Sequence, residues 1–186
     1  AASFAGMLNG MGRDRGASDP GGLTSESEAL IGLNQALERS PLVTVARVHG
    51  DAAGFGAGLA ALSDVAVAVR SARFSFPEAK IGLAPAVVLG WLPRLVGRRM
   101  AFWLTATAEP VTGEDLLRLG LVNALVEDEA ALDAAIAARV AALTLRKPRV
   151  QAEIKAMLRD FEGIPADKAY AMAGSRLVVG AQRKGE

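Results

Sequence analysis

A glycine-rich segment between two hydrophobic stretches constrains the fold more than any other part of the sequence. Residues 48–68 read VHGDAAGFGAGLAALSDVAVA and contain four glycines. VTVARV (43–48) and DVAVAVR (64–70) are typical of buried strands, and GAGLAALS (56–63) is typical of a short buried helix. A helix between two strands is a βαβ-like unit, so the sequence predicts a fold of the α/β class.

The glycine turn has two interpretations. Gly54, Phe55 and Gly56 follow a predicted strand and open a predicted helix. Backbone N–H groups and the helix dipole at such a turn favour an anion, so the turn is a candidate anion hole. The alternative is a tight turn that only lets helix and strand pack closely. The segment lacks the acidic residue of a dinucleotide fingerprint and the Gly-Lys-Ser/Thr of a phosphate-binding loop.

Before the glycine turn, the sequence predicts a loop and one helix. Residues 9–23 are rich in Gly, Asp and Arg without periodicity, which is typical of a loop. Ser25 and Glu28 form a capping-box pattern. The helix that follows would carry Leu30, Leu33 and Leu37 on one face and end before Pro41.

After the second strand, the predicted elements become mostly helical. Residues 74–97 are punctuated by proline and glycine and predict irregular structure. Two helices are predicted next, one from about residue 98 and one at 112–119 that is capped by Gly120. A short strand is predicted in LVNALV (121–126). Three more helices are predicted at 128–143, from Pro148 to Phe161 and at 166–182.

Composition narrows the function. The 186 residues suit one domain with or without a small appendage, and the 21 basic and 20 acidic residues give no nucleic-acid footprint. The absence of cysteine and the single histidine argue against a metal site. No apolar run reaches the length of a membrane span, so we expect a cytoplasmic protein without a membrane partner. The opening AASFAG lacks an initiator Met, and we expect that the chain starts inside a longer protein.

A second segment, FSFPEAKIGLAP (74–85), presents Glu78 in mostly apolar surroundings. Burial raises the pKa of a carboxyl group, which suits a general base that works near neutral pH. Taken alone, Glu78 is more readily interpreted as an exposed loop residue or as a partner of Lys80 than as a base.

The order of these segments resembles the crotonase (enoyl-CoA hydratase/isomerase) superfamily. The resemblance rests on AASFAGM (1–7), the glycine turn, SDVAVA (63–68), FPEAKIGLAP (76–85), LPRLVG (92–97) and GLVNALV (120–126). It implies a crotonase-like ββα spiral core in residues 1–127 and a C-terminal helical oligomerisation region in 128–186. It also implies a homo-trimer or hexamer, whose alanine-rich C-terminal helices pack closely.

The resemblance further implies an acyl-CoA thioester substrate and an enolate intermediate, with coenzyme A as part of the substrate and no separate cofactor or metal. The thioester oxygen would accept hydrogen bonds from the backbone N–H groups of Met7 and Phe55. Glu78 would be the catalytic carboxylate. The acyl-CoA pocket would be formed by Ala5, Gly6, Gly54, Gly56, Gly58, Val87 and Trp91.

The sequence also departs from the family pattern. Gly58 stands where hydratases carry a second glutamate, and Leu8 where the family has Asp. APAVVLGWLP (84–93) replaces a glycine-rich stretch, and we expect that the family's N-terminal strands are missing from the sequence. Asp51 is a weak substitute for the lost acid, because it precedes the helix.

One carboxylate suits a one-base proton shuttle better than the addition of water, which is well served by two. We therefore expect isomerase-like chemistry, with decarboxylation and C–C bond formation or hydrolysis as related possibilities. The alternative from another class is a catalytically weak acyl-CoA-binding or assembly protein.

The remaining polar residues have simpler interpretations. His49 and Asp64 are expected to be structural. The candidates for contact with CoA phosphates are Arg13, Arg15, Lys147, Arg149 and Lys155.

Overall fold

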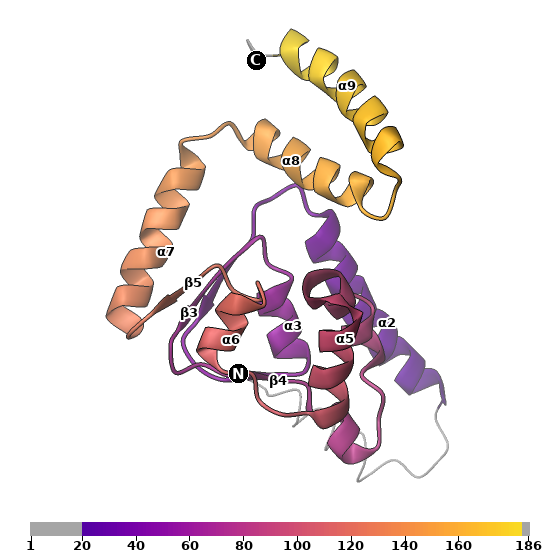
Figure 1. The fold of residues 1–186 in the computed structure, drawn as a ribbon, viewed down its shortest axis with the longest axis vertical. Coiled ribbons are helices and arrows are strands. Elements are labelled where there is room, and N and C mark those ends of the chain that lie inside the picture. Colours follow the sequence, from indigo (N-terminus) through magenta and orange to yellow (C-terminus); the bar gives the residue numbers. More distant parts are fainter. Residues whose placement is uncertain (1–19, 184–186) are drawn as a thin grey trace.

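The computed structural model describes residues 20–183, which form two small parallel sheets surrounded by helices (Figure 1). The larger sheet has the order β1-β3-β5 and contains β1 (Val45–Val48), β3 (Val65–Val69) and β5 (Ala124–Val126). The smaller sheet pairs β2 (Ala52–Ala53) with β4 (Phe74–Ser75). The predicted α/β class is confirmed.

The predicted strand–helix–strand unit is present. Helix α3 (Phe55–Ala61) joins the first sheet's β1 to β3, after the chain has passed through β2. Val45 lies opposite Val65 and Val48 opposite Ala68 in the parallel register. Parallel strands are covered on their faces, which explains why β3 is an almost unbroken run of valine and alanine.

Helix α2 (Pro20–Arg39) differs from the prediction at its start. It begins at Pro20, five residues before the expected cap at Ser25, and so takes in the last residues of the predicted loop. Proline fits the first turn of a helix, because the N–H that it lacks has no intrahelical partner there. The buried face differs from the prediction in part: Leu30 and Leu37 are half-buried, but Leu33 is 45% exposed and Asn34 is 8% exposed.

Residues 74–97 contain short elements rather than the expected irregular chain. A 3₁₀ helix, η1 (Pro77–Ile81), follows β4 and ends at Gly82, whose φ of 78° is in the left-handed region. Two helices come next, α4 (Ala86–Leu89) and α5 (Leu92–Thr107). Helix α5 is interrupted at Gly97, with φ 77° and ψ 158°, so a regular helix does run on from residue 98 as predicted.

The later helices agree closely with the sequence predictions. They are α6 (Gly113–Arg118), α7 (Glu129–Thr144), α8 (Pro148–Phe161) and α9 (Ala166–Gln182). Side chains cap two of them: Thr112 accepts a hydrogen bond from the Asp115 N–H and Asp128 from the Ala131 N–H.

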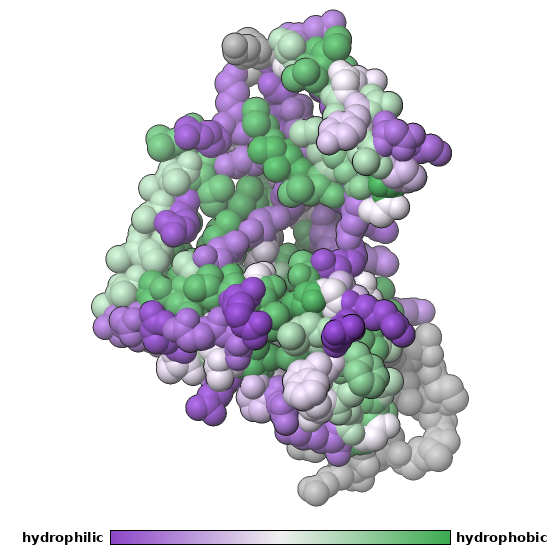
Figure 2. Space-filling view, in the orientation of Figure 1, coloured by the Kyte–Doolittle hydropathy of each residue, from purple (hydrophilic) through white to green (hydrophobic). Residues whose placement is uncertain are grey.

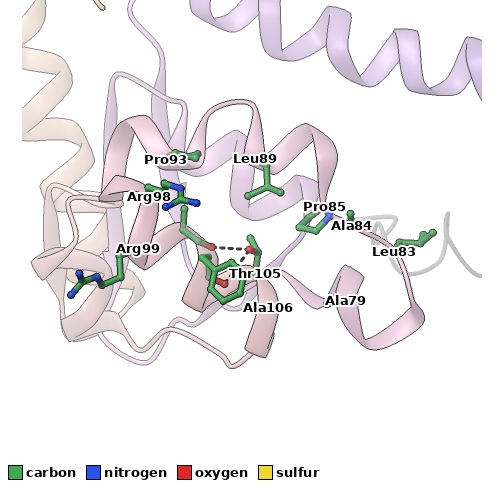
Figure 3. A pocket seen from close by; sticks show the side chains of 12 residues that line it. Ala79, Leu83, Ala84, Pro85, Leu89, Pro93, Arg98, Arg99, Thr105 and Ala106 are labelled. Atoms are coloured by element: carbon green, nitrogen blue, oxygen red, sulfur yellow. Dashed lines mark hydrogen bonds between the residues drawn. The ribbon is translucent and has the colours of Figure 1, made fainter.

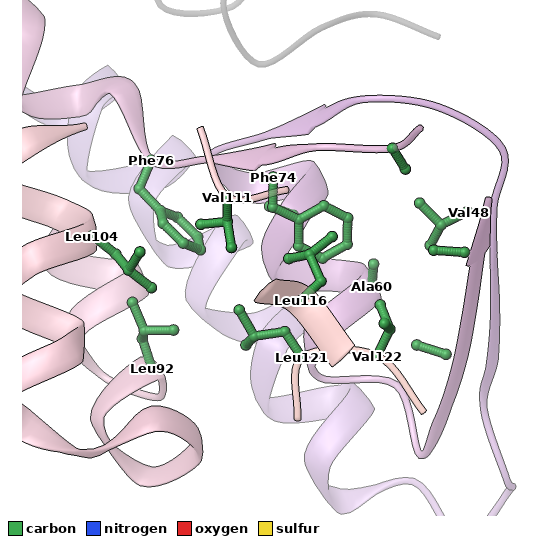
Figure 4. Packing of buried hydrophobic residues seen from close by; sticks show 14 of the residues in the cluster. Val48, Ala60, Phe74, Phe76, Leu92, Leu104, Val111, Leu116, Leu121 and Val122 are labelled. Carbon is green, nitrogen blue, oxygen red and sulfur yellow. The ribbon is translucent and has the colours of Figure 1, made fainter. Parts of the chain in front are cut away.

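The hydrophobic core lies between the sheets, α3, α5 and α6 (Figure 4). Its largest fully buried side chains are Phe74, Phe76, Leu92, Leu116, Leu121, Leu132 and Val67. Helix α7 packs on the larger sheet and contributes Leu132, whereas α8 and α9 bury no residue and extend beyond the core (Figure 1). Among residues 20–183, no helix is both long and apolar enough to cross a membrane.

Candidate active site

The glycine turn is held next to the segment that carries Glu78. The Gly54 N–H donates a hydrogen bond of 2.8 Å to the Ser75 carbonyl, three residues before Glu78. Gly54 has φ 52° and ψ −119°, a conformation that favours glycine. Phe55 is the first residue of α3. The small sheet therefore brings together two segments that the sequence predicted as parts of one site.

Glu78 lies in η1 and is 6% exposed. No hydrogen bond from residues 20–183 reaches its Oε2 atom. Burial raises the pKa of the Glu78 carboxyl above its ordinary value of 4.5, although a hydrogen bond from its own backbone N–H opposes this shift. The interpretation of Glu78 as an exposed loop residue is wrong. A buried carboxyl with a raised pKa is a typical general base.

The space beside Gly58 is bordered by an indole ring. A Cβ atom added at Gly58 would lie 3.2 Å from Cζ2 of Trp91 and 3.6 Å from its Cε2. Trp91 is 3% exposed and packs against Phe76, with ring centroids 6.1 Å apart and an interplanar angle of 65°. A glutamate side chain at Gly58 therefore has no room unless Trp91 moves.

A cavity of about 330 Å³ is lined in part by Gly50, Asp51 and Gly56 of the glycine turn. Two further cavities lie beside the segment that follows Glu78. The larger, of about 900 Å³, lies between η1, α4 and α5 (Figure 3). Ala79, the neighbour of Glu78, forms part of its wall, which is mostly apolar apart from Arg98, Arg99 and Thr105. The smaller, of about 350 Å³, lies between α2, α4 and α5 and is lined in part by Val87 and Trp91.

Several predicted residues lie outside the described residues: Ala5, Gly6, Met7, Leu8, Arg13 and Arg15. Asp51 is exposed, and its Oδ1 accepts a hydrogen bond of 2.9 Å from the Arg73 N–H. That bond links the glycine turn to the start of β4. His49 is exposed at the end of β1.

Two of the candidates for CoA phosphate contact, Lys155 and Arg149, have protein partners. The Lys155 ammonium lies 2.7 Å from Asp64 Oδ2 and 2.7 Å from the Leu42 carbonyl oxygen. Asp64 also accepts hydrogen bonds from the backbone and hydroxyl of Thr44, which supports its predicted structural role. Arg149 pairs with Glu153. Lys155 therefore ties α8 to the core.

Within residues 20–183, no cluster of three or more His, Cys, Asp or Glu side chains is arranged to hold a metal ion. The chemistry available to this part of the chain comes from one buried carboxyl, backbone N–H groups and an apolar surface.

Comparison with known proteins identifies the family. A sequence model of the enoyl-CoA hydratase/isomerase family matches residues 13–178. The chain belongs to this family. The resemblance seen in the sequence and the crotonase-type fold are thereby confirmed.

Individual relatives agree with this assignment. A probable enoyl-CoA hydratase of Bacillus subtilis is 32% identical over 155 residues, which are 83% of this chain and 57% of the relative. The bacillaene synthase dehydratase PksH of the same organism is 35% identical over 100 residues, which are 54% of this chain and 39% of PksH. The chain thus spans about half the length of these curated relatives.

Solved structures of the family superpose over most of the chain. Pseudomonas aeruginosa AtuE has a TM-score of 0.85 at 28% identity and covers 97% of this chain, which spans 68% of AtuE. An enoyl-CoA hydratase of Mycobacterium smegmatis has a TM-score of 0.82 at 32% identity, with 90% of this chain and 65% of the hydratase covered.

Two features of the site were not predicted from the sequence. The contact between Gly58 and Trp91 joins residues far apart in the chain, and its only signal was an unexpected tryptophan in the 84–93 segment. Asn34 is buried on the wall of the smaller cavity, but the leucine pattern of its helix did not predict that this residue faces inward.

Proposed function

We propose that this chain acts on an acyl-CoA thioester by forming its enolate, with Glu78 as the only carboxylate base. The observation that carries the proposal is the buried Glu78 carboxyl, whose Oε2 has no hydrogen-bond partner among residues 20–183, next to the glycine turn. Such a carboxyl exchanges a proton near neutral pH more readily than an exposed one, because its pKa is raised.

The enolate oxygen is stabilised at the N-terminus of α3. In this proposal the backbone N–H of Phe55 donates to the thioester oxygen, and the N–H of Met7 supplies the second donor. Fixed donors aimed at a developing negative charge contribute about 3–4 kcal/mol each in other enzymes. Gly54 and Gly56 let the backbone approach the thioester, and the Phe55 side chain narrows the acyl pocket.

The reaction that fits one base is the movement of a double bond. The Glu78 carboxylate removes a proton from C2 of a 3-enoyl thioester, and the electron pair moves to give the dienolate. The same carboxyl then returns that proton to C4, which yields the 2-enoyl thioester. No other co-reactant is needed, and Glu78 ends in its starting state.

Hydration is disfavoured by the contact between Gly58 and Trp91. Water addition requires a group that activates water, whereas residue 58 is a glycine whose added Cβ atom would already lie 3.2 Å from the Trp91 indole. Names of relatives that are hydratases therefore describe the family rather than the reaction of this chain.

A second candidate function follows from the same contact. A protein that only binds acyl-CoA also has no use for a second acid, so the loss at Gly58 is compatible with a catalytically weak binding or assembly protein. Such a protein has no use for a buried, unpartnered Glu78 either, because burying that carboxyl costs stability. The enzyme is therefore the better-supported candidate.

We also propose that the chain assembles into a trimer or hexamer through residues 128–186, as the family resemblance implies. Hydrophobic side chains reach the surface of the C-terminal helices (Figure 2). The exposed ones include Leu145, Leu158, Tyr170, Leu177 and Val178. Exposed apolar surface of this extent is typical of an interface.

The test of the proposed reaction compares two substrates of one chain length. Purified protein is incubated with 3-hexenoyl-CoA and with 2-hexenoyl-CoA, and the products are separated by chromatography. We expect 3-hexenoyl-CoA to become 2-hexenoyl-CoA, with little 3-hydroxyhexanoyl-CoA from either substrate. Rapid hydration of 2-hexenoyl-CoA would contradict the one-base proposal, whereas binding without any turnover would favour the binding protein.

A further inference from the structure

The smaller cavity near Trp91 has a polar wall that the proposed chemistry does not explain. Its lining includes Asn34, Gln35 and Glu38 from α2, together with Trp91 and Arg94. A volume of about 350 Å³ is enough for a small group of several heavy atoms. The polar side chains come mainly from one helix face, so the cavity is built by α2 against the segment that follows Glu78.

Asn34 is the unusual residue of this wall. It is 8% exposed, and its Oδ1 atom is buried without a hydrogen-bond partner among residues 20–183. A buried carbonyl oxygen without a donor lowers stability. On the same helix the neighbouring Leu33 is largely exposed. The helix therefore turns an amide, and not a leucine, toward the interior.

The cation that lines the wall, Arg94, is already paired with carboxylates. The Arg94 guanidinium forms an ion pair with Glu38 and lies 3.1 Å from Glu162 at the end of α8. These pairs leave Arg94 with no uncompensated charge to attract a carboxylate or phosphate. The cavity therefore suits a group that is not an anion and that carries a donor for Asn34 Oδ1. A hydroxyl meets both conditions.

Trp91 places this cavity next to the proposed site. One side of its indole closes the space at Gly58, and the residue also lines the cavity. Gly58 lies three residues after Phe55, about 4.5 Å along the axis of α3. Trp91 is therefore a wall that this cavity shares with the helix of the glycine turn, and in the proposed function an acyl group bound at that turn extends along it.

We propose that the cavity receives an acyl group that carries a hydroxyl beyond C3, whose O–H donates a hydrogen bond to Asn34 Oδ1. The proposal rests on the proposed function and adds the substrate class: hydroxylated acyl thioesters rather than plain hydrocarbon chains. A site built to bond a hydroxyl discriminates against the analogue without it, because the buried amide is then left unpaired.

The test measures dissociation constants by titration calorimetry for three matched pairs of thioesters. These are 4-hydroxybutanoyl-CoA, 5-hydroxypentanoyl-CoA and 6-hydroxyhexanoyl-CoA, each with its unsubstituted counterpart. In the wild-type chain we expect at least one hydroxylated ligand to bind about tenfold more tightly than its counterpart. In Asn34→Leu, which has a similar volume, we expect that preference to disappear.

Two controls separate a binding role from a structural one. Ile31→Leu changes the same helix and the same cavity wall without touching the amide, and it should keep the preference. Asn34→Asp retains an oxygen acceptor and should restore part of the preference that Asn34→Leu loses. Thermal unfolding of each variant shows whether it is folded, and Asn34→Leu should be at least as stable as the wild type, because it removes an unpaired polar group.

The possible outcomes are distinct. Equal binding of both members of every pair in the wild type would overturn the inference and would leave the proposed function intact, since plain acyl-CoAs still bind. A hydroxyl preference that survives in Asn34→Leu would also overturn it. Failure of every thioester to bind would refute the proposed function and this inference with it.

Discussion

Glu78 is the residue on which the chemistry depends, and its burial has consequences at the scale of a single side chain. A carboxyl group with a raised pKa destabilises the folded chain when it ionises. The raised pKa also makes the Glu78 carboxylate a better general base near neutral pH. Stability and activity at this residue are therefore expected to change with pH in opposite directions.

The first prediction concerns stability. The pKa of Glu78 is higher in the folded chain than its ordinary value of 4.5, so the folded state binds more protons than the unfolded state between these two values. Stability contributed by this group is therefore lost as pH rises through that window. Glu78→Gln does not ionise, so it should melt at a higher temperature than the wild type at pH 7.

The difference in melting temperature should shrink at about pH 4, where the carboxyl is mainly protonated in both states. Differential scanning fluorimetry across this range measures it. Glu109→Gln is the matched control, because Glu109 is exposed and should show no such pH-dependent gain. A Glu78→Gln variant that is less stable than the wild type at pH 7 would show that the charge is compensated.

The second prediction concerns activity. The base form of Glu78 is the carboxylate, so kcat/KM for 3-enoyl-CoA should rise with pH and level off above the raised pKa. A pH–rate profile should show this inflection above pH 4.5. A rate that falls over the same range would mean that the working form of Glu78 is the acid.

At the scale of elements, α3 and the loop before α5 are fitted to each other through Gly58 and Trp91. A methyl group at Gly58 would meet the indole at 3.2 Å, whereas one at Gly56 would meet nothing within 4 Å. Both glycines lie in the same short helix. They therefore form a matched pair for measuring how tightly Trp91 closes this side of the site.

The third prediction uses that pair. Gly58→Ala should lower the free energy of unfolding by about 1–3 kcal/mol through overpacking. Gly56→Ala should be neutral or stabilising by about 0.5–1 kcal/mol, since alanine favours the helix. Denaturant titration measures both. Trp91→Phe should relieve part of the Gly58→Ala cost in the double variant, and strict additivity of the two changes would contradict the contact.

The bounds of the helices and strands were largely predictable from the sequence, but the residues on the buried face of a helix were not. Pro148 was predicted at a helix start and the structure confirms it, whereas the cap at Asp128 emerges only from the structure, in which the helix begins at Glu129. Helix α2 is an example. Its leucine pattern predicted that Leu33 is buried, yet packing against the Trp91 segment buries Asn34 in place of Leu33.

The candidate site, like the helices and strands, was predictable only in part from the sequence. Its two principal segments were identified by order and by residue type. The burial of Glu78 and the filled space at Gly58 depend on Phe76 and Trp91, which meet only in the folded chain. No local pattern encodes such contacts.

At the scale of the whole molecule, the C-terminal helices expose several apolar side chains in the single chain. Only α7 among them contributes a fully buried core residue, and Lys155 of α8 is anchored through Asp64. The proposed trimer would cover the remaining surface. It would also account for two long helices, α8 and α9, that bury no residue by themselves.

The fourth prediction tests this assembly. The wild-type chain should have the mass of a trimer or hexamer by light scattering. The double change Leu158→Glu and Leu177→Glu should shift it toward the monomer, because it places charges in the apolar interface. Lys168→Glu, an exposed charge reversal on α9, is the control and should leave the mass unchanged. A wild-type chain that is stably monomeric would refute the proposal.

The most direct test of the central claim is proton exchange at the carbon next to the thioester. Saturated and 3-unsaturated acyl-CoAs are incubated with the protein in deuterated water, and deuterium at C2 is followed by NMR. We predict exchange with the wild type, a loss of about 10²- to 10⁴-fold in Glu78→Gln, and no loss in Glu109→Gln. Measurable CoA binding without exchange for any thioester, or full exchange in Glu78→Gln, would contradict enolate formation by Glu78.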